Sequence, residues 1–591
     1  MVEPRYRWVF PADLPLTADL IGAAERHALS HRVAGILAAR GVTGSADLDA
    51  WFGEPRGGLH DPALLPDAAI VVERLGRARA AGERVLVFGD FDADGLTGLA
   101  ILVIALRRFG LEAIPYVPSR LDEGHGLSLA ALTAAEAAGA SLIVTVDCGS
   151  TSVAEVAEAG RRGIDVIVTD HHRVPAVTPA AIALVNPHRP DSVYPDRRLA
   201  GSGVAFKVAC LLLGPEPGGL DAALGLADLA TIGTVADVAP IVGENRAIAR
   251  IGLDRIRTAP RPGLVALLDR AGVAPAAVDL ETVAFTIAPR LNAAGRVGEA
   301  VEAANLLLAA DPVEAAARAE TLETANGTRR DLMKTAVGEA RAALDGSPDA
   351  SVTIIRGPWT VGIVGLVASR LVEDRSRPAV VGADLGAVVR ASCRSDGSLD
   401  LGAALEECAD LFIRFGGHAG AAGFELPTDR WDEFRERFSA IAARTARPDP
   451  RATLALDLAL PARAVDYVLH RDLGRLAPCG PGNPEPLVAV LGLTATRVRA
   501  ATGGHSQLTL KRDRDVLDGI AFGRSDIAET VREGDRLDVV ARITSRSFGG
   551  FESLQLDIRD VALSGTHPEA AALLAAADPA LVRVALAGGA A

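Results

Sequence analysis

Residues 85–95 read VLVFGDFDADG, an apolar run that passes directly into a cluster of aspartates. Further short apolar runs follow at 113–117 (AIPYV), 142–146 (LIVTV) and 166–169 (VIVT). Continuously apolar segments of this length are typical of strands that are buried on both faces of a parallel sheet. The gaps between the runs leave room for crossover helices at about 97–109, 128–139 and 151–162. The sequence therefore predicts an α/β domain built from βαβ units.

Acidic residues and histidines follow three of these predicted strands. They are Asp90, Asp92 and Asp94 after the first, Asp147 after the third, and Asp170, His171 and His172 after the fourth. Open α/β sheets bind ligands at the carboxyl ends of their strands, so these side chains should converge. Converging carboxylates repel one another unless protons or cations neutralise them. The two imidazoles favour metal, because mixed oxygen and nitrogen ligands suit Mn²⁺, while carboxylates and water also suit Mg²⁺.

Each of these residues also has an ordinary structural interpretation. GDFDADG resembles the first half of a calcium-binding EF-hand loop, but Ile101 stands where that loop needs a bidentate Glu, and a strand precedes it. A single Asp at a strand end is more often a helix cap than a ligand, and a single His pair is more often hydrogen-bonded scaffolding. Their joint placement at strand ends is what favours a metal site.

The composition indicates a multidomain chain. At 591 residues, we expect about two to four domains. No uncharged apolar run is long enough to span a bilayer, and the N-terminal MVEPRYRWVF has no signal-peptide pattern, so we expect a cytoplasmic protein without a membrane partner. The five cysteines are an odd number, widely spaced and without CxxC, which favours reduced thiols over disulfides or a zinc ribbon.

The net charge of −14 argues mildly against nucleic-acid binding through a globally basic surface. Any DNA contact must therefore be local. Carboxylates gathered around metal ions would add to the negative total without opposing a basic groove elsewhere in the chain.

The rest of the chain has three further parts. The charged stretch at 305–346 predicts a connecting helix, and strand patterns at 351–355 and 379–382 with the Gly-rich FGGHAGAAG at 415–423 predict a second α/β domain. After PCGPGNPEP at 478–486, short alternating strands separated by turn residues continue to about 562, which suits a small β-barrel. The predicted boundaries are an N-terminal helical segment at 1–70, a catalytic domain at 71–304, the connecting helix at 305–346, the second domain at 347–446, the barrel at 447–565 and an Ala-rich tail at 566–591.

Several motifs also resemble a known family. GDFDADG, VTVDCGS, TDHH and GTVADVAP resemble, in this order, the four motifs of DHH phosphoesterases. YVPSRLDEGHGL, LAGSGVAFK, APRLNAAGR, GIVGLVASRL, FGGHAGAAG and PGNPEP are similar to segments of the RecJ family within them. The resemblance runs from about residue 30 to 562. It implies a parallel-sheet DHH domain, a smaller DHH-associated α/β domain beyond a long helix, and an OB-fold barrel.

The resemblance also implies a role for each residue at the strand ends. Asp92 and Asp147 would hold one ion of Mn²⁺ or Mg²⁺, and Asp147 would bridge to a second ion held by Asp94, His171 and Asp237. Asp90 would lie beside the first ion, and His172 would face the scissile phosphate. Asp170 would orient an imidazole, as partners of ligand histidines usually do. Paired ions activate water and stabilise the leaving oxygen during in-line displacement.

A pocket for the 5′ phosphate is implied by further matching segments. Its residues would be Arg120, Arg290, Ser392, Arg394, Ser395 and His418. A surface salt bridge is the alternative for any one of these Arg residues. For Arg394 we favour phosphate binding, because it lies in ASCRS at the position of the family's Gly-Ser-x-Arg-Ser element, and guanidinium binds phosphate bidentately. The glycines around His418 would let backbone approach a phosphate, although a GGH loop is also compatible with a simple tight turn.

The predicted barrel carries basic and aromatic residues of the kind that bind single strands. They are Arg497, Arg499, Lys511, Arg512, Arg514, Arg524 and Arg546, with Phe522, Phe548 and Phe551. OB-folds combine basic grooves with aromatic stacking. Because acidic residues interleave these charges, we expect the barrel as a whole to contact DNA and assign no single residue.

These expectations define one function and two rivals. The function is a metal-dependent exonuclease that removes nucleotides from the 5′ end of single-stranded DNA in repair and recombination. We expect a monomer that works with a helicase and a single-strand-binding protein. The first rival is a DHH enzyme acting on short oligonucleotides, cyclic dinucleotides or pyrophosphate, for which a barrel would be superfluous. The second is a non-catalytic relative that binds DNA ends, which loss of metal ligands would mark; the sequence has lost none.

Overall fold

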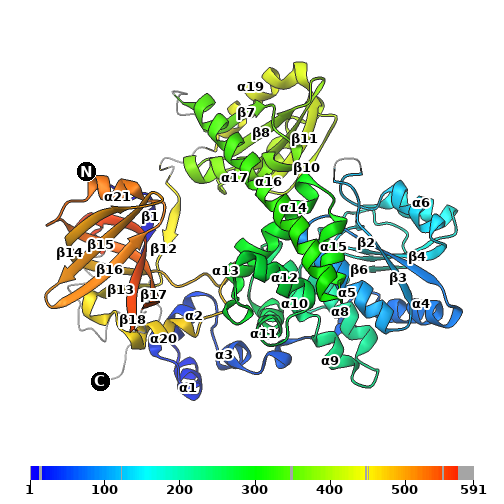
Figure 1. Ribbon diagram of the computed structural model, residues 1–591, viewed down its shortest axis with the longest axis horizontal. Coiled ribbons are helices and arrows are strands. Elements are labelled where there is room, and N and C mark those ends of the chain that lie inside the picture. Colours follow the sequence, from blue (N-terminus) through cyan, green and yellow to red (C-terminus); the bar gives the residue numbers. More distant parts are fainter. Residues whose placement is uncertain are drawn as a thin grey trace. The chain divides into compact units, whose positions relative to one another are not determined.

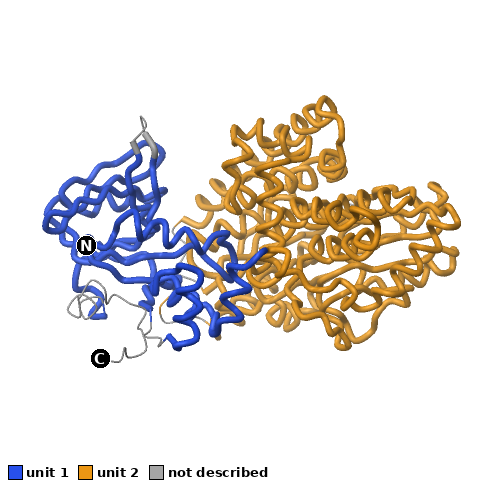
Figure 2. Tube along the Cα trace, turned by 90° about the horizontal axis from the view of Figure 1, so that it is seen from below, with its two compact units in different colours: residues 1–54, 451–591 blue, residues 55–450 orange. Residues whose placement is uncertain are grey.

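The computed structural model describes residues 2–11, 16–120, 123–345, 351–445, 449, 451–548 and 551–569. Residues 55–450 form one compact unit, and residues 1–54 form a second unit together with the chain from 451 onward (Figure 2). Each unit is built around its own sheets. The predicted Ala-rich tail falls mostly on residues 570–591, outside the described residues.

The first sheet of the larger unit has strand order β3-β2-β4-β5-β6, and all its neighbouring pairs are parallel (Figure 1). Its strands are β2 (Arg84–Gly89), β3 (Glu112–Tyr116), β4 (Ala140–Val146), β5 (Asp165–Thr169) and β6 (Ala183–Val185). The connecting helices are α5 (Ala93–Arg108), α6 (Leu129–Ala137) and α7 (Val153–Arg161). The predicted α/β class is confirmed, and β6 is an additional strand that the apolar pattern did not predict.

Side chains of successive strand residues enter two different cores. Val85 and Val87 of β2 belong to one cluster of buried residues, whereas Leu86 and Phe88 belong to another. Both faces of the sheet are therefore covered, as continuously apolar strands require. The remaining helices of this domain are α4 (Ala68–Ala81), α8 (Gly201–Leu213), α9 (Gly219–Leu224), α10 (Ala227–Ala236), α11 (Gly243–Thr258) and α12 (Pro262–Ala271).

One glycine fixes how closely α5 packs on this core. A Cβ at Gly98 would lie 2.5 Å from Cγ1 of Val146 and 3.2 Å from Cα of Ser202. Helix α5 can therefore approach both β4 and the first turn of α8 only because residue 98 has no side chain. This close approach brings the end of β4 and the start of α8 next to the aspartates at the start of α5.

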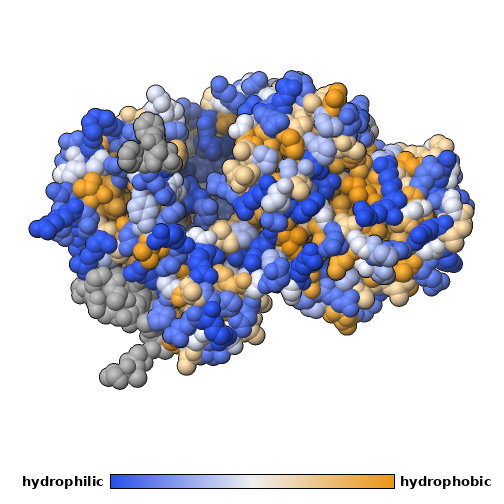
Figure 3. Space-filling model, turned by 60° about the horizontal axis from the view of Figure 1, so that its bottom comes forward, coloured by the Kyte–Doolittle hydropathy of each residue, from blue (hydrophilic) through white to orange (hydrophobic). Residues whose placement is uncertain are grey.

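A segment of this core is apolar enough to cross a membrane by composition alone. It is Gly219–Ala236, which covers α9 and α10, and 67% of it is buried inside the fold. Burial of this extent is expected of core helices in a globular domain. On the face shown in Figure 3, hydrophilic residues are spread among the hydrophobic ones.

A helical segment leads from the first sheet to the second. It contains α13 (Leu280–Thr282), the π-helix η4 (Val283–Ile287), α14 (Ala288–Val297), α15 (Val301–Leu308) and the long α16 (Pro312–Leu344). Asp311 caps α16 by accepting a hydrogen bond from the backbone N–H of Glu314, and Pro312 occupies the first helical position. The predicted long connecting helix is thus present.

The second sheet has strand order β10-β11-β9-β8-β7, with β7 parallel to β8 and the other pairs antiparallel. Its strands are β7 (Thr353–Gly357), β8 (Ala379–Asp384), β9 (Val388–Arg394), β10 (Arg414–Gly417) and β11 (Ala421–Pro427). Helices α17 (Val361–Arg375), α18 (Leu401–Glu406) and α19 (Trp431–Ala443) accompany it. This is the smaller α/β domain that the sequence predicted.

The smaller unit contains a closed barrel of strands β14, β15, β16, β18 and β17, sealed by pairing of β14 with β17. The strands are β14 (Val488–Ala501), β15 (His505–Arg512), β16 (Asp515–Ala521), β17 (Arg536–Phe548) and β18 (Phe551–Leu563). The same unit also contains β12 (Thr453–Ala455), β13 (Leu458–Pro461), α20 (Tyr467–Gly474) and α21 (Ser525–Thr530). The predicted small barrel is confirmed.

The N-terminal segment folds with this barrel. Strand β1 (Arg7–Val9) pairs in parallel with β12, and α1 (Ala18–Arg26), α2 (His31–Ala39) and α3 (Ser45–Phe52) follow it. Asp560 of β18 is fully buried and accepts hydrogen bonds from the backbone N–H of Arg5, the backbone N–H of Tyr6 and Nε1 of Trp8. Nothing in the sequence pattern indicated that the two ends of the chain meet.

Candidate metal centre and phosphate site

The aspartates after β2 are held by backbone N–H groups. Asp92 is the N-cap of α5, and its Oδ1 accepts hydrogen bonds from the backbone N–H of Asp94 (3.0 Å) and Gly95 (3.1 Å). Asp94 is buried, and its carboxylate accepts from the backbone N–H of Gly201 (2.7 Å) and Ser202 (2.9 Å) at the start of α8. A helix N-terminus stabilises a carboxylate in this way. Both carboxylates therefore have fixed orientations.

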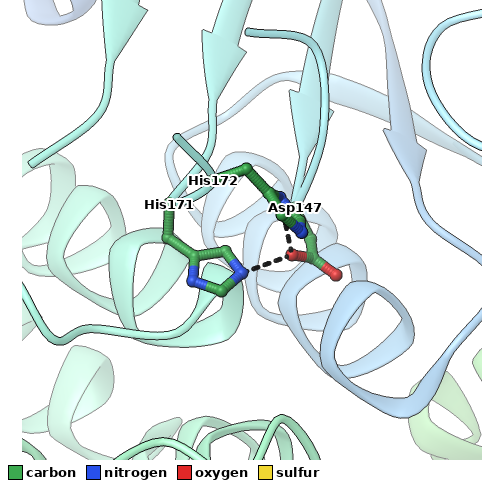
Figure 4. A group of neighbouring side chains, drawn as sticks. All are labelled: Asp147, His171 and His172. Carbon is green, nitrogen blue, oxygen red and sulfur yellow. Dashed lines mark ion pairs between the residues drawn. The ribbon is translucent and has the colours of Figure 1, made fainter. Parts of the chain in front are cut away.

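Asp147 stands directly after β4 with a φ of 61°, in the left-handed region. Its Oδ1 lies 3.0 Å from Nε2 of His171 and 3.9 Å from Nδ1 of His172, and Figure 4 shows both imidazoles beside this oxygen. A Cβ on Gly201 would lie 2.6 Å from Cβ and Oδ1 of Asp147. The side chain of Asp147 is therefore confined between the start of α8 and the two histidines.

His171 connects Asp147 to two more carboxylates. Its Nε2 lies 3.9 Å from Oδ2 of Asp94, and its Nδ1 lies 3.9 Å from Oδ2 of Asp237 at the end of α10. The potential ligand atoms of Asp94, His171 and Asp237 lie within 4.8 Å of one another, as do those of Asp147, His171 and His172. The structure thus brings together residues from four separated segments that the sequence singled out.

The residues present fit a divalent cation. Among the described residues, the buried atoms Asp147 Oδ1 and His171 Nε2 have no hydrogen-bond partner, although they face each other. Burial and the neighbouring carboxylates raise the pKa of Asp92 and of Asp147, and raise the pKa of Asp237 to about 7. Protein alone thus leaves the negative charges uncompensated, and a bound cation would neutralise them.

Asp170 differs from these aspartates, because its carboxylate is hydrogen-bonded to the two histidine residues. Its Oδ1 accepts hydrogen bonds from the backbone N–H groups of His171 (2.7 Å) and His172 (3.1 Å) and lies 2.8 Å from Nδ1 of His172. Although burial alone would raise it, these contacts lower the pKa of Asp170, and the same hydrogen bond raises the pKa of His172 to about 9. The contact with Asp170 therefore fixes the orientation of the His172 ring.

Sequence reasoning missed Asn186, which follows β6 and is fully buried. Its Nδ2 donates to the backbone carbonyl of His172 (2.8 Å) and to Oγ of Ser150 (3.0 Å). The backbone N–H of Ser150 in turn donates to Asp170 Oδ2 (3.0 Å). Asn186 thus completes the support of the histidine pair. It could not be found earlier because β6 itself was not predicted.

Three half-buried guanidinium groups gather next to the aspartates. Arg120 lies over the ring of Phe91 at 4.8 Å, Arg394 donates to the carbonyl of Cys393 (2.8 Å), and Arg296 donates to the carbonyl of Gly362 (3.0 Å). Burial lowers the pKa of all three. Arg120 and Arg394 add to this for Arg296, whose pKa falls to about 9. Within the described parts of the chain, none of the three has an ion-pair partner, which is unusual for cations that are largely removed from water.

The other residues expected at the phosphate pocket have mixed positions. Ser392 alternates with Arg394 along β9, so both share one face, and Gly365 of α17 packs against both. Oγ of Ser395 donates to the carbonyl of Leu399, and His418 is exposed beyond β10. Arg290 forms an ion pair with Glu323 at 2.6 Å. Arg296, six residues further along the same segment, was not predicted but lies among the unpaired cations.

Family comparisons agree with this organisation. Residues 84–234 match the model described as DHH family, N-terminal domain, and residues 349–444 match the DHHA1 domain. Residues 456–560 match the RecJ OB domain. The RecJ of Bacillus subtilis is 33% identical over 571 residues, which cover 95% of this chain and 72% of that protein. The chain belongs to the RecJ family.

Other RecJ proteins match over similar lengths. The RecJ of Thermus thermophilus is 39% identical over 474 residues, covering 79% of this chain and 67% of that protein. The RecJ of Escherichia coli is 34% identical over 578 residues, covering 92% and 97%. These relatives are each named a single-stranded-DNA-specific exonuclease.

Solved RecJ structures share the fold. The structure of Thermus thermophilus RecJ with Mn²⁺ superimposes with a TM-score of 0.80 at 32% identity, covering 95% of this chain and 81% of that one. The structure of the same protein with Mg²⁺ gives a TM-score of 0.75 at 31% identity, covering 95% and 80%. Both neighbours contain ions of the kind that the acidic cluster described above fits.

Proposed function

We propose that this chain is a metal-dependent exonuclease that hydrolyses single-stranded DNA from its 5′ end. The observation that carries the proposal is the adjacency of two unlike clusters in one unit. Arg120 contacts the ring of Phe91, and Phe91 stands between Asp90 and Asp92 in the chain. A site for cations and a site for an anion thus begin one residue apart, as hydrolysis of a terminal phosphodiester requires.

Different side chains contact the 5′ phosphate and the scissile phosphate of the terminal nucleotide in this proposal. In this proposal Arg120, Arg296 and Arg394 bind the 5′ phosphate, with Ser392 beside Arg394. Asp170 holds Nδ1 of His172, whose side chain is 44% exposed, so Nε2 is free to donate to an oxygen of the scissile phosphate. Anchoring the terminal phosphate fixes cleavage at the first internucleotide bond, which makes the polarity 5′ to 3′.

The metal ligands keep the assignment that the resemblance implied. We propose two ions of Mn²⁺ or Mg²⁺, one held by Asp92 and Asp147 and the other by Asp94, Asp147, His171 and Asp237. When bound, such a pair activates water, neutralises the phosphodiester and stabilises the leaving oxygen. Oδ1 of Asp147 and Nε2 of His171 support this assignment, because both are among the buried polar atoms of the described residues that form no hydrogen bond, and they lie 3.0 Å apart.

The barrel favours this proposal over a short-substrate enzyme. A dinucleotide needs no binding surface beyond the cleavage site, whereas residues 456–560 match the RecJ OB domain. OB-folds hold single strands through basic grooves and stacking. We also propose that Arg290, Ser395 and His418 contact the phosphate, and that the domains have the boundaries given above. We further propose a cytoplasmic monomer that works with a helicase and a single-strand-binding protein.

The test uses a 3′-labelled, 5′-phosphorylated single strand with Mn²⁺, the same strand with the label at the 5′ end, and a blunt duplex. We expect 5′-mononucleotides as the first products, shortening from the 5′ end, and little digestion of duplex. Asp147→Asn is the inactive control. Internal cuts, or release of the 3′ nucleotide first, would refute the proposed polarity.

A further inference from the structure

We infer that His125 contacts a phosphate oxygen of the terminal nucleotide, and that Asp90 acts by positioning it. This inference rests on the proposed exonuclease function. Sequence reasoning assigned no role to His125 and placed Asp90 beside a metal ion. The structure gives both carboxylate oxygens of Asp90 other partners: Oδ1 accepts from the backbone N–H of Phe91 at 2.8 Å, and Oδ2 lies 2.9 Å from Nδ1 of His125.

The imidazole of His125 is fixed along one edge and open along the other. Its side chain is 69% exposed, whereas that of Asp90 is 7% exposed. Its ring centroid lies 4.4 Å from that of Phe91, which is buried. Among the described residues, Nε2 has no hydrogen-bond partner. A buried carboxylate that orients an exposed imidazole leaves Nε2 as the atom that can meet a ligand.

The backbone around His125 is held firmly for so exposed a side chain. Gly124 and Gly126 flank it with φ of 78° and 88°, a conformation that favours glycine. The carboxylate of Glu123 accepts from Tyr116 OH (3.0 Å), from the backbone N–H of Ser119 (2.8 Å) and from Oγ of Ser128. A surface loop that is hydrogen-bonded to the domain and presents an exposed polar side chain is a common location for a binding residue.

Phe91 brings His125 and the phosphate cluster together. The same ring carries Arg120 at 4.8 Å and His125 at 4.4 Å. Arg120 and His125 thus pack against one aromatic ring, and in this inference an oxygen of the phosphate held by Arg120 lies at Nε2 of His125. Because Nδ1 faces the carboxylate of Asp90 at 2.9 Å, the opposite ring edge presents Nε2, which can form a hydrogen bond with a phosphate oxygen.

The test compares His125→Ala, His125→Gln, Asp90→Asn and the double variant Asp90→Asn with His125→Ala. Readouts are kcat and KM on a 5′-phosphorylated strand and calorimetric Mn²⁺ affinity. We expect His125→Ala to raise KM about 10-fold, as loss of a hydrogen bond to a charged group does. Mn²⁺ affinity should stay within about twofold, because no metal ligand has changed, and His125→Gln, which keeps a donor, should recover part of the loss. His31→Ala is the matched control, an exposed histidine of α2.

The double variant decides the role of Asp90. If Asp90 acts through His125, Asp90→Asn raises KM in the parent protein and adds nothing further in His125→Ala. Full additivity, or weaker Mn²⁺ binding by Asp90→Asn, would show that Asp90 acts on the metal directly and would overturn the inference. Parental kinetics in His125→Ala would overturn it as well. A parent protein that does not digest single strands would instead refute the proposed function.

Discussion

The residue 55–450 unit contains two sets of charged side chains, and the chain itself neutralises only one of them. Lys207 of α8 and Glu244 of α11 are 1% and 0% exposed and form an ion pair of 2.8 Å. Glu244 also accepts hydrogen bonds from Tyr194 OH (2.6 Å) and from the backbone N–H of His60 (2.9 Å), and Lys207 donates to the carbonyl of His60. In this network, each charge meets its opposite within the chain.

In the cluster at the strand ends, the carboxylates have no such partner within the described part of the chain. Asp92, Asp94, Asp147 and Asp237 are carboxylates with no Lys or Arg ion pair among the described residues, and burial raises the pKa of three of them. Next to them, Arg120, Arg296 and Arg394 are cations for which the described part of the chain supplies no carboxylate partner. A structural network is completed by its own residues, whereas a binding site leaves charge for its ligands to complete. Removing a charge should therefore have opposite consequences for stability in the two networks.

The largest expected effect is that of Asp147→Asn. Hydrolysis should fall by at least about 10³-fold, the upper end of what one electrostatic group contributes. Mn²⁺ binding should weaken, because Asp147 is the proposed bridge. In EDTA, the variant should melt at a higher temperature than the parent, because one of several buried like charges is gone. A lower melting temperature in EDTA, or two Mn²⁺ sites of parental affinity by calorimetry, would contradict the comparison.

The next effect is that of Arg394→Ala, expected to lower kcat/KM on 5′-phosphorylated strands about 100-fold through loss of a bidentate, charge-assisted contact. Strands with a 5′ hydroxyl should lose much less, and Mn²⁺ affinity should not change. Arg414→Ala is the matched control, because Arg414 is exposed on the same sheet and paired with Glu425. Equal losses on both kinds of strand would remove the 5′ phosphate from the role of Arg394.

The metal ligands could be predicted from the sequence because the carboxyl ends of parallel strands meet by geometry. The proximity of Asp147 and His171 followed from the prediction of β4 and β5 alone.

The cationic site was harder to predict from the sequence. Arg290 and Arg296 lie in one motif, APRLNAAGR. Arg290 forms an ion pair with Glu323 of α16, whereas Arg296 has no ion-pair partner among the described residues. Sequence spacing cannot show which guanidinium a distant carboxylate will neutralise.

The same limit applies to the ends of the chain. The sequence pattern predicted a helical segment at residues 1–70 ahead of the first domain. In the structure, Asp560 accepts three hydrogen bonds from Arg5, Tyr6 and Trp8. Pairing between segments some 550 residues apart leaves no periodic signal in either. The fold of each domain was therefore predictable from local patterns, while the grouping of the N-terminal segment with the barrel was not.

A fragment of residues 55–450 tests what the barrel contributes, and it respects the observed grouping of the chain ends. It retains every proposed metal ligand and the three unpaired arginines. We expect near-parental hydrolysis of very short strands and an affinity for long strands that is lower by about 10-fold or more, since stacking alone contributes about 1–3 kcal/mol per base. Its salt dependence of binding should also be shallower, because fewer phosphates are neutralised. Equal affinity of both proteins for long strands would exclude the barrel from substrate binding.

The smallest effect on activity is expected for Lys207→Met, which breaks the closed network. Activity per folded molecule should remain at the parental level, because Lys207 contacts Glu244 and His60 but none of the proposed ligands. The free energy of unfolding should fall by about 3–5 kcal/mol, since Glu244 keeps a buried charge without its partner. Adding Glu244→Gln should recover much of this loss, because no charge is then left buried. The amide oxygen can still accept from the backbone N–H of His60, and the amide NH2 can donate to the Tyr194 hydroxyl oxygen in place of accepting from it. Denaturant unfolding of the parent, the single variant and the double variant measures both steps. Lys207→Met would then destabilise the Lys207–Glu244 network, in which the chain supplies both charges. Asp147→Asn would stabilise the metal-free aspartate cluster, in which the described part of the chain supplies no Lys or Arg as a compensating cation. A Lys207→Met protein as stable as the parent, or a double variant less stable than the single one, would show that the two networks do not differ in this way.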